Sequence, residues 1–349
     1  PSAHAAAGRA RALAVEPLDT LGNPNPNGKY VLLSMGMSNT TQEFCSASGA
    51  LPCDAWTFMG QSAINPRVNT ANLVIANGAM GGQNAATWDS PADPNYTRVL
   101  NQVLTPQGLS EAQVQAVWIK VADAGPTVSL PNANADAFIL EGLTASVIRA
   151  AKVRYPNLKL AFLSNRIYAG YAGYPVPTVS ALNPEPYAYE SGFAMKWLIE
   201  AQINQMSGGP FDPIAGNLDY NSIVPWIGWG PDLWADGTTI RSDGLQYVCA
   251  DFQGDGTHPA MAAEQKVGFR LLMFMLTSRF ATPWFRKCEP GDMNGDGVLD
   301  GKDVSLFAST MLNPIAATDY QRCSADCNDD GSLVLAGDTP AFVLRLLSW

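Results

Sequence analysis

Short apolar runs that each stop at a small polar turn are the feature of this sequence that most restricts its fold. Four such runs have the length and composition of buried strands, at residues 30–34, 72–76, 114–121 and 158–164. Longer stretches with helical periodicity lie at residues 137–155, 189–206 and 259–280. Strands that alternate with helices predict an α/β fold, with a parallel sheet that carries helices on its faces.

Composition and charge exclude several classes of protein. The 349 residues are 47% hydrophobic and 15% charged, which suits one large domain with a small one rather than a disordered or coiled-coil chain. Lys and Arg total 21 against 31 Asp and Glu, so a basic surface for nucleic acid is not expected. No run approaches the roughly 18 to 20 continuous apolar residues of a membrane-spanning helix, so no membrane span is expected.

The sequence divides into three segments. Residues 1–28 are rich in Ala, Pro, Asn and Gly and predict an extended N-terminal arm or linker. Residues 29–287 hold the predicted strands and long helices. Residues 288–349 are rich in Asp, Asn and Gly and carry 10 acidic against 3 basic side chains, so the acidity of the chain is concentrated there. This density suits either a solvated tail or a cation site, and the spacing of the acidic residues favours the cation site.

The six cysteines show no CxxC or His-bearing metal pattern, which predicts disulfides. Six cysteines permit 15 connectivities, and the sequence cannot choose among them. The expected pairs are Cys45 with Cys53, Cys323 with Cys327 and, by elimination, Cys249 with Cys288. Disulfides in turn predict a secreted or cell-surface protein. The chain starts at Pro1 with an Ala-rich segment that is no intact signal peptide, as expected of a mature or truncated product.

Histidine is so rare that it narrows the search for catalytic chemistry. Only His4, in the predicted arm, and His258 are present. Asp255 precedes His258 by three residues, so its carboxylate can accept the Nδ1 proton and leave Nε2 free as a base. The alternative is a helix-capping turn with a solvated histidine.

Ser38 meets the requirements for a nucleophile at the end of a strand. Gly36 permits a sharp exit from the strand, and Ser38 then opens a helix whose first N–H groups can face a developing oxyanion. The alternative is a serine that only caps the helix. The serine motif and the Asp255–His258 motif together are stronger evidence for a catalytic site than either motif alone.

These motifs resemble the SGNH (GDSL-like) hydrolases, which are flavodoxin-like α/β esterases with a three-layer α/β/α fold, over about residues 28–285. The block from Gly36 to Asn39 is similar to the GQSN form of carbohydrate acetylesterases and implies that Ser38 is the nucleophile. Residues 77–81 are similar to the second block and imply that Gly81 donates its N–H to the oxyanion. Asp255 and His258 match the last block as orienting acid and general base. The resemblance implies a carbohydrate ester as substrate and no cofactor for catalysis.

The third block departs from the family pattern. Ala122 lies where the family usually places an Asn that donates to the oxyanion. Lys120 lies where the acetylesterase form has a glutamine, and it either reaches the site or is solvated or ion-paired. Loss of one oxyanion donor costs about a hundredfold in rate. The alternative to an esterase is therefore a non-catalytic glycan-binding or structural surface protein on the same fold.

Three tryptophans lie in the Gly- and Pro-rich stretch 225–234: Trp226, Trp229 and Trp234. Flat indole faces complement pyranose rings, so these side chains could form a sugar-stacking wall. An irregular loop that buries its own tryptophans is the favoured alternative. Nothing resembles a long acyl-binding helix, so a carbohydrate ester is preferred over a lipid.

The C-terminal segment contains two loops in which oxygen-bearing side chains alternate. The first has the EF-hand spacing of calcium ligands at positions 1, 3, 5, 7, 9 and 12: Asp292, Asn294, Asp296, the carbonyl of Val298, Asp300 and Asp303. The second keeps positions 1, 3, 5 and 7: Asp326, Asn328, Asp330 and Ser332. It has Val334 at position 9 and Gly337 at position 12, with Asp338 one place late, so weaker binding is expected.

The two loops, each followed by a helix, resemble a type I dockerin module over residues 289–349. The resemblance implies a small all-α, EF-hand-like module that folds with two structural Ca²⁺ ions and docks to a cohesin domain on another protein or a cell-surface anchor. The irregular second loop and the expected Cys323–Cys327 bridge depart from the dockerin pattern. The plainer alternative is a small calcium-stabilised cap.

Overall fold

The computed structural model describes residues 2–173 and 182–348 and divides into two compact units. Unit 1 comprises residues 1–64 and 72–274, and unit 2 comprises residues 65–71 and 275–349. The division falls earlier than the boundary predicted at residues 287–288. The segment after residue 274 belongs to unit 2 because it is bonded within that unit, as in the ion pair between Arg286 and Asp329.

Unit 1 is built on a parallel sheet of five strands in the order β2-β1-β3-β4-β5. The strands are β1 (Tyr30–Gly36), β2 (Leu73–Asn77), β3 (Val114–Lys120), β4 (Leu160–Leu163) and β5 (Trp226–Trp229). This confirms the predicted parallel α/β sheet, and its order is that of flavodoxin-like folds. The first four strands fall where the sequence predicts them. The sequence does not predict β5, because the Gly- and Pro-rich stretch 225–234 that contains it has the composition of a loop.

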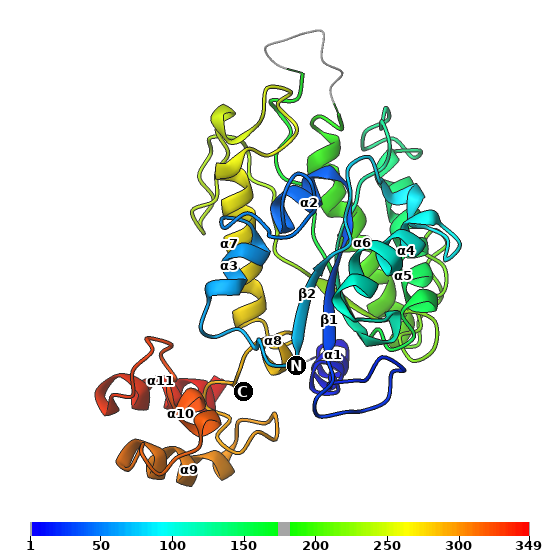
Figure 1. Ribbon diagram of the computed structural model, residues 1–349. Coiled ribbons are helices and arrows are strands. Elements are labelled where there is room, and N and C mark those ends of the chain that lie inside the picture. Colours follow the sequence, from blue (N-terminus) through cyan, green and yellow to red (C-terminus); the bar gives the residue numbers. More distant parts are fainter. Residues whose placement is uncertain (1, 174–181, 349) are drawn as a thin grey trace. The chain divides into compact units, whose positions relative to one another are not determined.

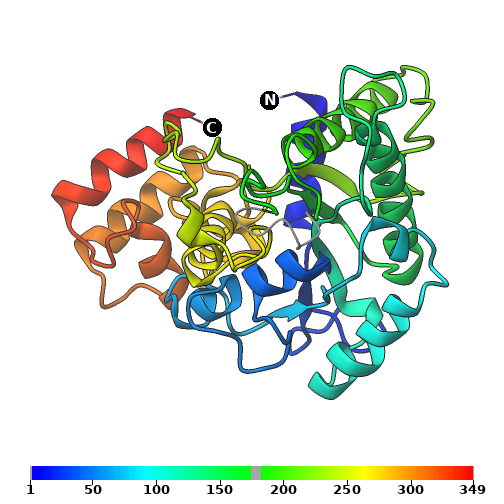
Figure 2. The ribbon, with the colours of Figure 1, turned by 90° about the horizontal axis from the view of Figure 1, so that it is seen from above.

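Helices cover both faces of this sheet. They are α1 (Ala3–Leu13), α2 (Ser38–Phe44), α3 (Phe58–Ile64), α4 (Pro94–Arg98), α5 (Asp136–Arg154), α6 (Tyr187–Met206) and α7 (Met261–Thr277), whose last turn belongs to unit 2. Figures 1 and 2 show α2, α3 and α7 on one face and α4, α5 and α6 on the other. The sheet is thus the middle of three layers, and β1, β3 and β4 are buried along their whole length, as parallel strands between two helix layers must be.

The N-terminal segment is not the extended arm that the sequence predicts. Residues 3–13 form α1, whose start is capped by the Ser2 hydroxyl. The His4 ring stacks on Trp226 of β5 with 4.9 Å between ring centroids, and its Nε2 lies 2.9 Å from the carbonyl oxygen of Ile227. Packing on the sheet edge stabilises this short helix, and such tertiary packing leaves little periodicity in the sequence.

Unit 2 contains the helices that were predicted after the two acidic loops. Its helices are α8 (Thr282–Phe285), α9 (Gly301–Leu312), α10 (Asp319–Ala325) and α11 (Leu335–Ser348). The small core includes Phe307 of α9 and Phe342 of α11, whose rings stack with centroids 4.1 Å apart. Among the described residues, no helix of either unit has the length and apolarity that a membrane crossing requires.

The disulfides confirm one predicted pair and correct the other two. Cys45 is bonded to Cys53 as predicted, but Cys288 is bonded to Cys323. Cys249 is an exposed thiol, and Cys327 is a thiol buried in the core of unit 2. Cys323 and Cys327 do not pair, because Cys323 lies within α10 whereas Cys327 follows the end of that helix and turns into the core.

Candidate active site

Ser38 lies at the carboxyl edge of the sheet, where β1 stands between β2 and β3. Ligands of open parallel sheets bind at this point, because the connections from neighbouring strands leave in opposite directions there. The chain turns from β1 into α2 at Gly36, which has a φ of +155°. A Cβ atom at Gly36 would lie 2.3 Å from the carbonyl oxygen of Lys120 and 2.4 Å from Thr40 Oγ1, so only glycine fits. This turn places Ser38 as the first residue of α2.

Three side chains predicted to act together are brought together by the fold. Nε2 of His258 lies 2.9 Å from Oγ of Ser38. Nδ1 of the same ring is hydrogen-bonded to Oδ2 of Asp255. Oδ1 of Asp255 accepts the backbone N–H groups of Thr257 and His258, each at 3.0 Å. A hydroxyl, an imidazole and a carboxylate linked in this order can activate the serine as a nucleophile.

Asp255 is held in its charged form. Burial raises the pKa of this carboxyl group, but the hydrogen bonds from the His258 ring and from the backbone N–H groups of His258 and Thr257 outweigh it, so the pKa lies below its usual value. The ionised carboxylate keeps the imidazole proton on Nδ1. Nε2 is then left as an acceptor that faces Ser38.

Gly81, the predicted oxyanion donor, lies beside the serine. A Cβ atom built on Gly81 would lie 3.8 Å from the Cβ of Ser38. Among the described residues, neither the N–H of Ser38 nor that of Gly81 has a hydrogen-bond acceptor. Contacts among the described residues thus leave both N–H groups unoccupied.

The loop that carries Gly81 is fixed by a polar network under the site. Ser34 Oγ donates to Asn77 Oδ1 at 2.7 Å and accepts the N–H groups of Gly78 and Ala79 at 3.2 and 3.3 Å. Asn77 Nδ2 in turn donates to Thr41 Oγ1 in α2 at 2.6 Å. The ends of β1 and β2 are thus tied to the helix that begins with Ser38.

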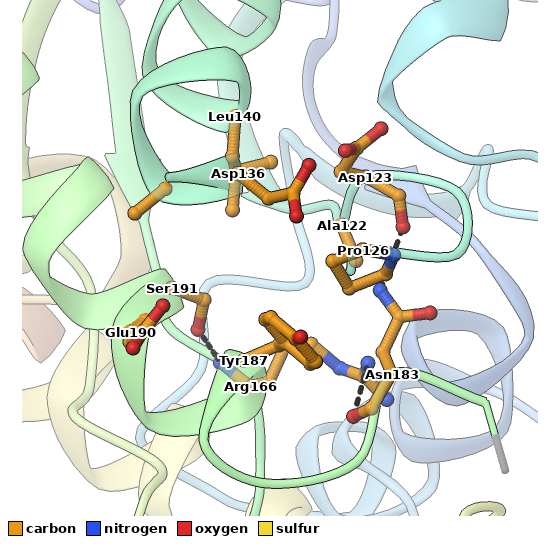
Figure 3. A pocket seen from close by; sticks show the side chains of 11 residues that line it. Ala122, Asp123, Pro126, Asp136, Leu140, Arg166, Asn183, Tyr187, Glu190 and Ser191 are labelled. Carbon is orange, nitrogen blue, oxygen red and sulfur yellow. Dashed lines mark hydrogen bonds between the residues drawn. The ribbon is translucent and has the colours of Figure 1, made fainter. Parts of the chain in front are cut away.

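Ala122, at the position of the third-block asparagine, has no side-chain hydrogen-bond donor. Ala122 lines a cavity of about 20 Å³ together with Asp123, Arg166 and Asn183, as Figure 3 shows. Asn183 Nδ2 donates to the carbonyl of Asp123 at 2.6 Å, which closes one side of this cavity. Its volume is enough for about one water molecule and too small for a substrate.

Lys120 is ion-paired, which is one of the alternatives that the sequence offered to a role at the active site. Its side chain is fully buried, and Nζ lies 2.5 Å from both carboxylate oxygens of Glu43, which is also fully buried. Burial lowers the pKa of Lys120 and raises that of Glu43, and their attraction opposes both shifts. Glu43 lies on α2, so the pair holds the nucleophile helix against the end of β3.

Asn39 has a positioning role that the sequence did not reveal. Its side chain is 1% exposed, and Nδ2 donates to the carbonyl of Thr257 at 3.0 Å. This bond joins the start of α2 to the loop that carries Asp255 and His258. The only signal in the sequence was the position of Asn39 next to Ser38, and that position carries no information on the partner.

The tryptophans of residues 225–234 differ in accessibility. Trp226 is 2% exposed, because it packs under α1, so it cannot form part of a sugar-stacking wall. Trp229, at the end of β5, is 40% exposed, and Trp234 is half-buried. The favoured alternative, a loop that buries its own tryptophans, thus describes Trp226 and not Trp229.

The first acidic loop of unit 2 is curled by its own carboxylates. Asp292 accepts the N–H groups of Gly295 and Gly297 at 2.8 and 2.9 Å, and Asp303 accepts those of Met293 and Asp300 at 2.8 and 2.9 Å. The remaining predicted ligands of this loop, Asn294, Asp296, Val298 and Asp300, lie between these two anchors. Hard oxygen donors of this kind suit Ca²⁺.

The second loop repeats this pattern with one residue more. Asp338 Oδ1 accepts the N–H of Cys327 at 2.9 Å, and Oδ2 accepts that of Val334 at 2.8 Å. In the first loop, Asp303 accepts the matching N–H groups, those of Met293 and Asp300. Asp338 therefore stands where the sequence count put Gly337. Among the described residues, no three His, Cys, Asp or Glu side chains form a cluster that could hold a metal as they stand. The fit to calcium therefore rests on the type and order of the oxygen donors in each loop.

Comparisons with known proteins find solved structures that are similar to this chain at low identity. No protein-family model matches this chain, and no curated protein does. A carbohydrate esterase family 2 enzyme with a carbohydrate-binding domain from Corynascus thermopiles (Myceliophthora fergusii) is 13% identical, with 71% of this chain and 66% of that chain covered and a TM-score of 0.39. A carbohydrate esterase family 3 protein from Talaromyces cellulolyticus is 11% identical, with 72% and 98% covered and a TM-score of 0.39. Phospholipase A1 from Streptomyces albidoflavus is 16% identical, with 70% and 98% covered and a TM-score of 0.33.

Proposed function

We propose that unit 1 is a serine esterase that hydrolyses carbohydrate esters, with acetyl as the acyl group. The observation that carries this proposal is the 2.9 Å contact between Ser38 Oγ and His258 Nε2, with Asp255 on the far side of the ring. The two open N–H groups beside Ser38 add an oxyanion site. Preference for a carbohydrate rests on the resemblance of residues 36–39 to the acetylesterase motif.

The reaction follows from this geometry. His258 Nε2 takes the proton of Ser38 as Oγ bonds to the ester carbonyl carbon, and the N–H groups of Ser38 and Gly81 donate to the oxyanion. His258 returns the proton to the sugar oxygen as its bond to the carbonyl carbon breaks, which leaves the acyl group on Ser38. Water then loses a proton to His258 and attacks the acyl carbon, and Ser38 recovers its hydrogen as the carboxylic acid leaves.

One observation favours the alternative, a glycan-binding or structural protein without catalysis. Ala122 offers no oxyanion donor, and Lys120 is bound to Glu43 and cannot supply one. With two donors in place instead of three, the expected cost is about a hundredfold in rate, which slows an esterase without abolishing it. The esterase therefore remains the proposal.

For unit 2 the proposal is a calcium-stabilised, dockerin-like module that attaches the protein to a cohesin domain or a cell-surface anchor. Bound calcium would neutralise the acidic loops and fix their conformation. The residues that would hold the two ions are Asp292, Asn294, Asp296, Val298, Asp300 and Asp303 in the first loop and Asp326, Asn328, Asp330, Ser332 and Asp338 in the second. The two disulfides support an extracellular location for such a protein.

The test compares hydrolysis of p-nitrophenyl acetate and p-nitrophenyl octanoate by the wild type and by Ser38→Ala, with calcium present. Turnover of the acetate that is lost in Ser38→Ala supports a serine esterase for short acyl groups. A preference for octanoate would redirect the assignment to lipids. Equal rates for the two proteins on both esters, with no labelling of Ser38 by a fluorophosphonate, would favour the non-catalytic alternative.

A further inference from the structure

A second cavity of unit 1 opens on the same edge of the sheet as Ser38. We call it the aromatic pocket. It lies beyond the ends of β4 and β5, where Asn165 and Trp229 line it, and α6 forms its other wall. Its volume is about 330 Å³, within the range of about 300 to 1,000 Å³ that is usual for small-molecule sites.

Exposed aromatic rings form the walls of this pocket. Trp229 and Tyr189 are 40% and 45% exposed. Tyr189 packs on Trp234 with centroids 4.6 Å apart, and the Trp234 Nε1 donates to Glu185 Oε1 at 2.9 Å. Tyr189 and Trp234 therefore brace one another, and Trp229 and Tyr189 remain partly exposed to solvent.

Polar groups on the rim are held in fixed positions. Asn165 is 7% exposed; its Nδ2 donates to Asp232 Oδ1 at 2.6 Å, and its Oδ1 accepts the N–H of Leu233 at 2.7 Å. The other oxygen of Asp232 is paired with Arg241 at 2.8 Å, yet 58% of the Asp232 side chain is exposed. Lys196, on the α6 wall, is half exposed and pairs with Glu200 one turn further along the helix. A carboxylate and an ammonium group thus border the aromatic faces.

We infer that the aromatic pocket binds a sugar ring of the glycan chain whose ester group lies at Ser38. Aromatic faces that stack on the C–H faces of a pyranose, bordered by a carboxylate and an ammonium group that bond to its hydroxyls, match this ligand class. β5 is three strands from β1, which corresponds to about 14 Å along the edge of the sheet. The ligand is therefore a chain of several sugars rather than a single one. An acyl chain fits less well, because it would cover the charged groups of Asp232 and Lys196 without bonding to them.

Gly192 supplies a sharp test because it forms part of the α6 wall. A Cβ atom at this position would meet Asn165 Nδ2 at 3.5 Å, which is ordinary contact distance. Gly192→Ala should therefore fold normally and serve as the control, whereas Gly192→Leu should fill the pocket. Trp229→Ala removes a stacking face without filling the pocket.

The experiment measures KM and kcat of these variants on acetylated hexasaccharides of xylose, mannose and glucose, on p-nitrophenyl acetate and on p-nitrophenyl octanoate. For Trp229→Ala and Gly192→Leu, the expected result is a KM about tenfold higher on at least one hexasaccharide, with kcat and all p-nitrophenyl acetate kinetics unchanged. Unchanged KM values on all three hexasaccharides would overturn the inference. A defect confined to p-nitrophenyl octanoate would overturn it in favour of an acyl-binding site.

The inference rests on the proposed function for the position of the ester, so binding is measured separately. Isothermal titration of the unacetylated hexasaccharides into Ser38→Ala, with and without Trp229→Ala, reports on the pocket when no ester is hydrolysed. Weaker binding in the double variant supports the pocket even if the wild type proves to have no esterase activity. Binding that does not depend on Trp229, or no binding, overturns it whether or not the esterase assignment holds.

Discussion

Nε2 of His258 lies 2.9 Å from Oγ of Ser38, although 220 positions separate the two residues in the sequence. Two independent features create this contact. The glycine turn at Gly36 brings Ser38 to the edge of the sheet, and the Asn39 side chain holds the Thr257 carbonyl in the loop of His258. The pair is thus positioned by buried contacts on both sides.

Asp255→Asn should lower kcat on p-nitrophenyl acetate by about 10³- to 10⁴-fold with little change in KM. An amide can bond to His258 with the imidazole in the wrong tautomer, which places a proton on Nε2 where a base is needed. Steady-state kinetics measures this effect. Asp236→Asn, at an exposed acidic residue of unit 1, is the control and should retain the wild-type rate. Wild-type activity in Asp255→Asn would exclude the proposed role of the carboxylate.

Gly81→Pro should reduce kcat by about 10²- to 10³-fold, because proline has no N–H to donate to the oxyanion. Gly81→Ala keeps the N–H, and its Cβ would meet Ser38 at 3.8 Å, so most of the activity should remain. Kinetics of both variants, with circular dichroism to verify folding, separates the two effects. An equal loss in the two folded variants would mean that space around Gly81, and not its N–H, controls the rate.

Calcium titration should give two ions per chain, and Asp338→Ala should reduce this to one. Asp338 accepts the same set of backbone bonds in the second loop as Asp303 does in the first. Isothermal titration calorimetry measures the number of ions, and a chelator should lower the melting temperature of unit 2. Asp319→Asn, which changes an exposed acidic residue outside both loops, is the control. Two ions bound by Asp338→Ala, or none by the wild type, would contradict the assignment.

Asp329→Asn should destabilise unit 2 by about 3 kcal/mol at pH 7, because Arg286 would be left buried without its carboxylate partner. Asn suits the left-handed backbone at this position, where φ is +61°. Burial raises the pKa of Asp329, but hydrogen bonds from Arg286 and the charges of Arg67 and Arg345 outweigh it and hold the pKa below its usual value.

The stabilising effect of Asp329 should therefore depend on pH with a definite sign. Because the folded-state pKa is lower than the unfolded value of about 3.9, the stabilisation is complete above that pH and is lost as the pH falls through the folded-state value. Calorimetric melting is measured between pH 7 and pH 3 at saturating calcium. The stability of unit 2 in the wild type and in Asp329→Asn should converge at the acid end of this range. A constant difference across this range would refute the proposed ionic role.

The contact of Ser38, His258 and Asp255 could be predicted from the sequence more fully than the segments around it. Gly36, Ser38, Asp255 and His258 are constrained by local turn geometry, so their short motifs are visible without the fold. Strands β1, β3 and β4 are buried along their whole length, and short runs rich in apolar residues mark them in the sequence, as they do the partly buried edge strand β2. β5 contains Gly228 between two tryptophans, a composition that is also typical of a loop.

Features that depend on packing between distant segments were missed. α1 is stabilised by contacts of His4 with β5, more than 200 residues away. The Cys288–Cys323 bond joins sulfurs 35 residues apart, while the closer Cys327 turns into the core. The second acidic loop has one residue more than the first, and the sequence does not show where in the loop the extra residue lies. A count of positions from Asp326 therefore puts Gly337, and not Asp338, at position 12. In each case the deciding contact is absent from the local sequence.

The central claim is that Ser38 forms a covalent acyl intermediate. Its most direct test is mass spectrometry of the protein, quenched in acid during turnover of p-nitrophenyl acetate, for the wild type, Ser38→Ala and His258→Ala. We expect an acetyl group on the peptide that contains Ser38 in the wild type only. Acetyl on another residue, or wild-type turnover by Ser38→Ala, would contradict it.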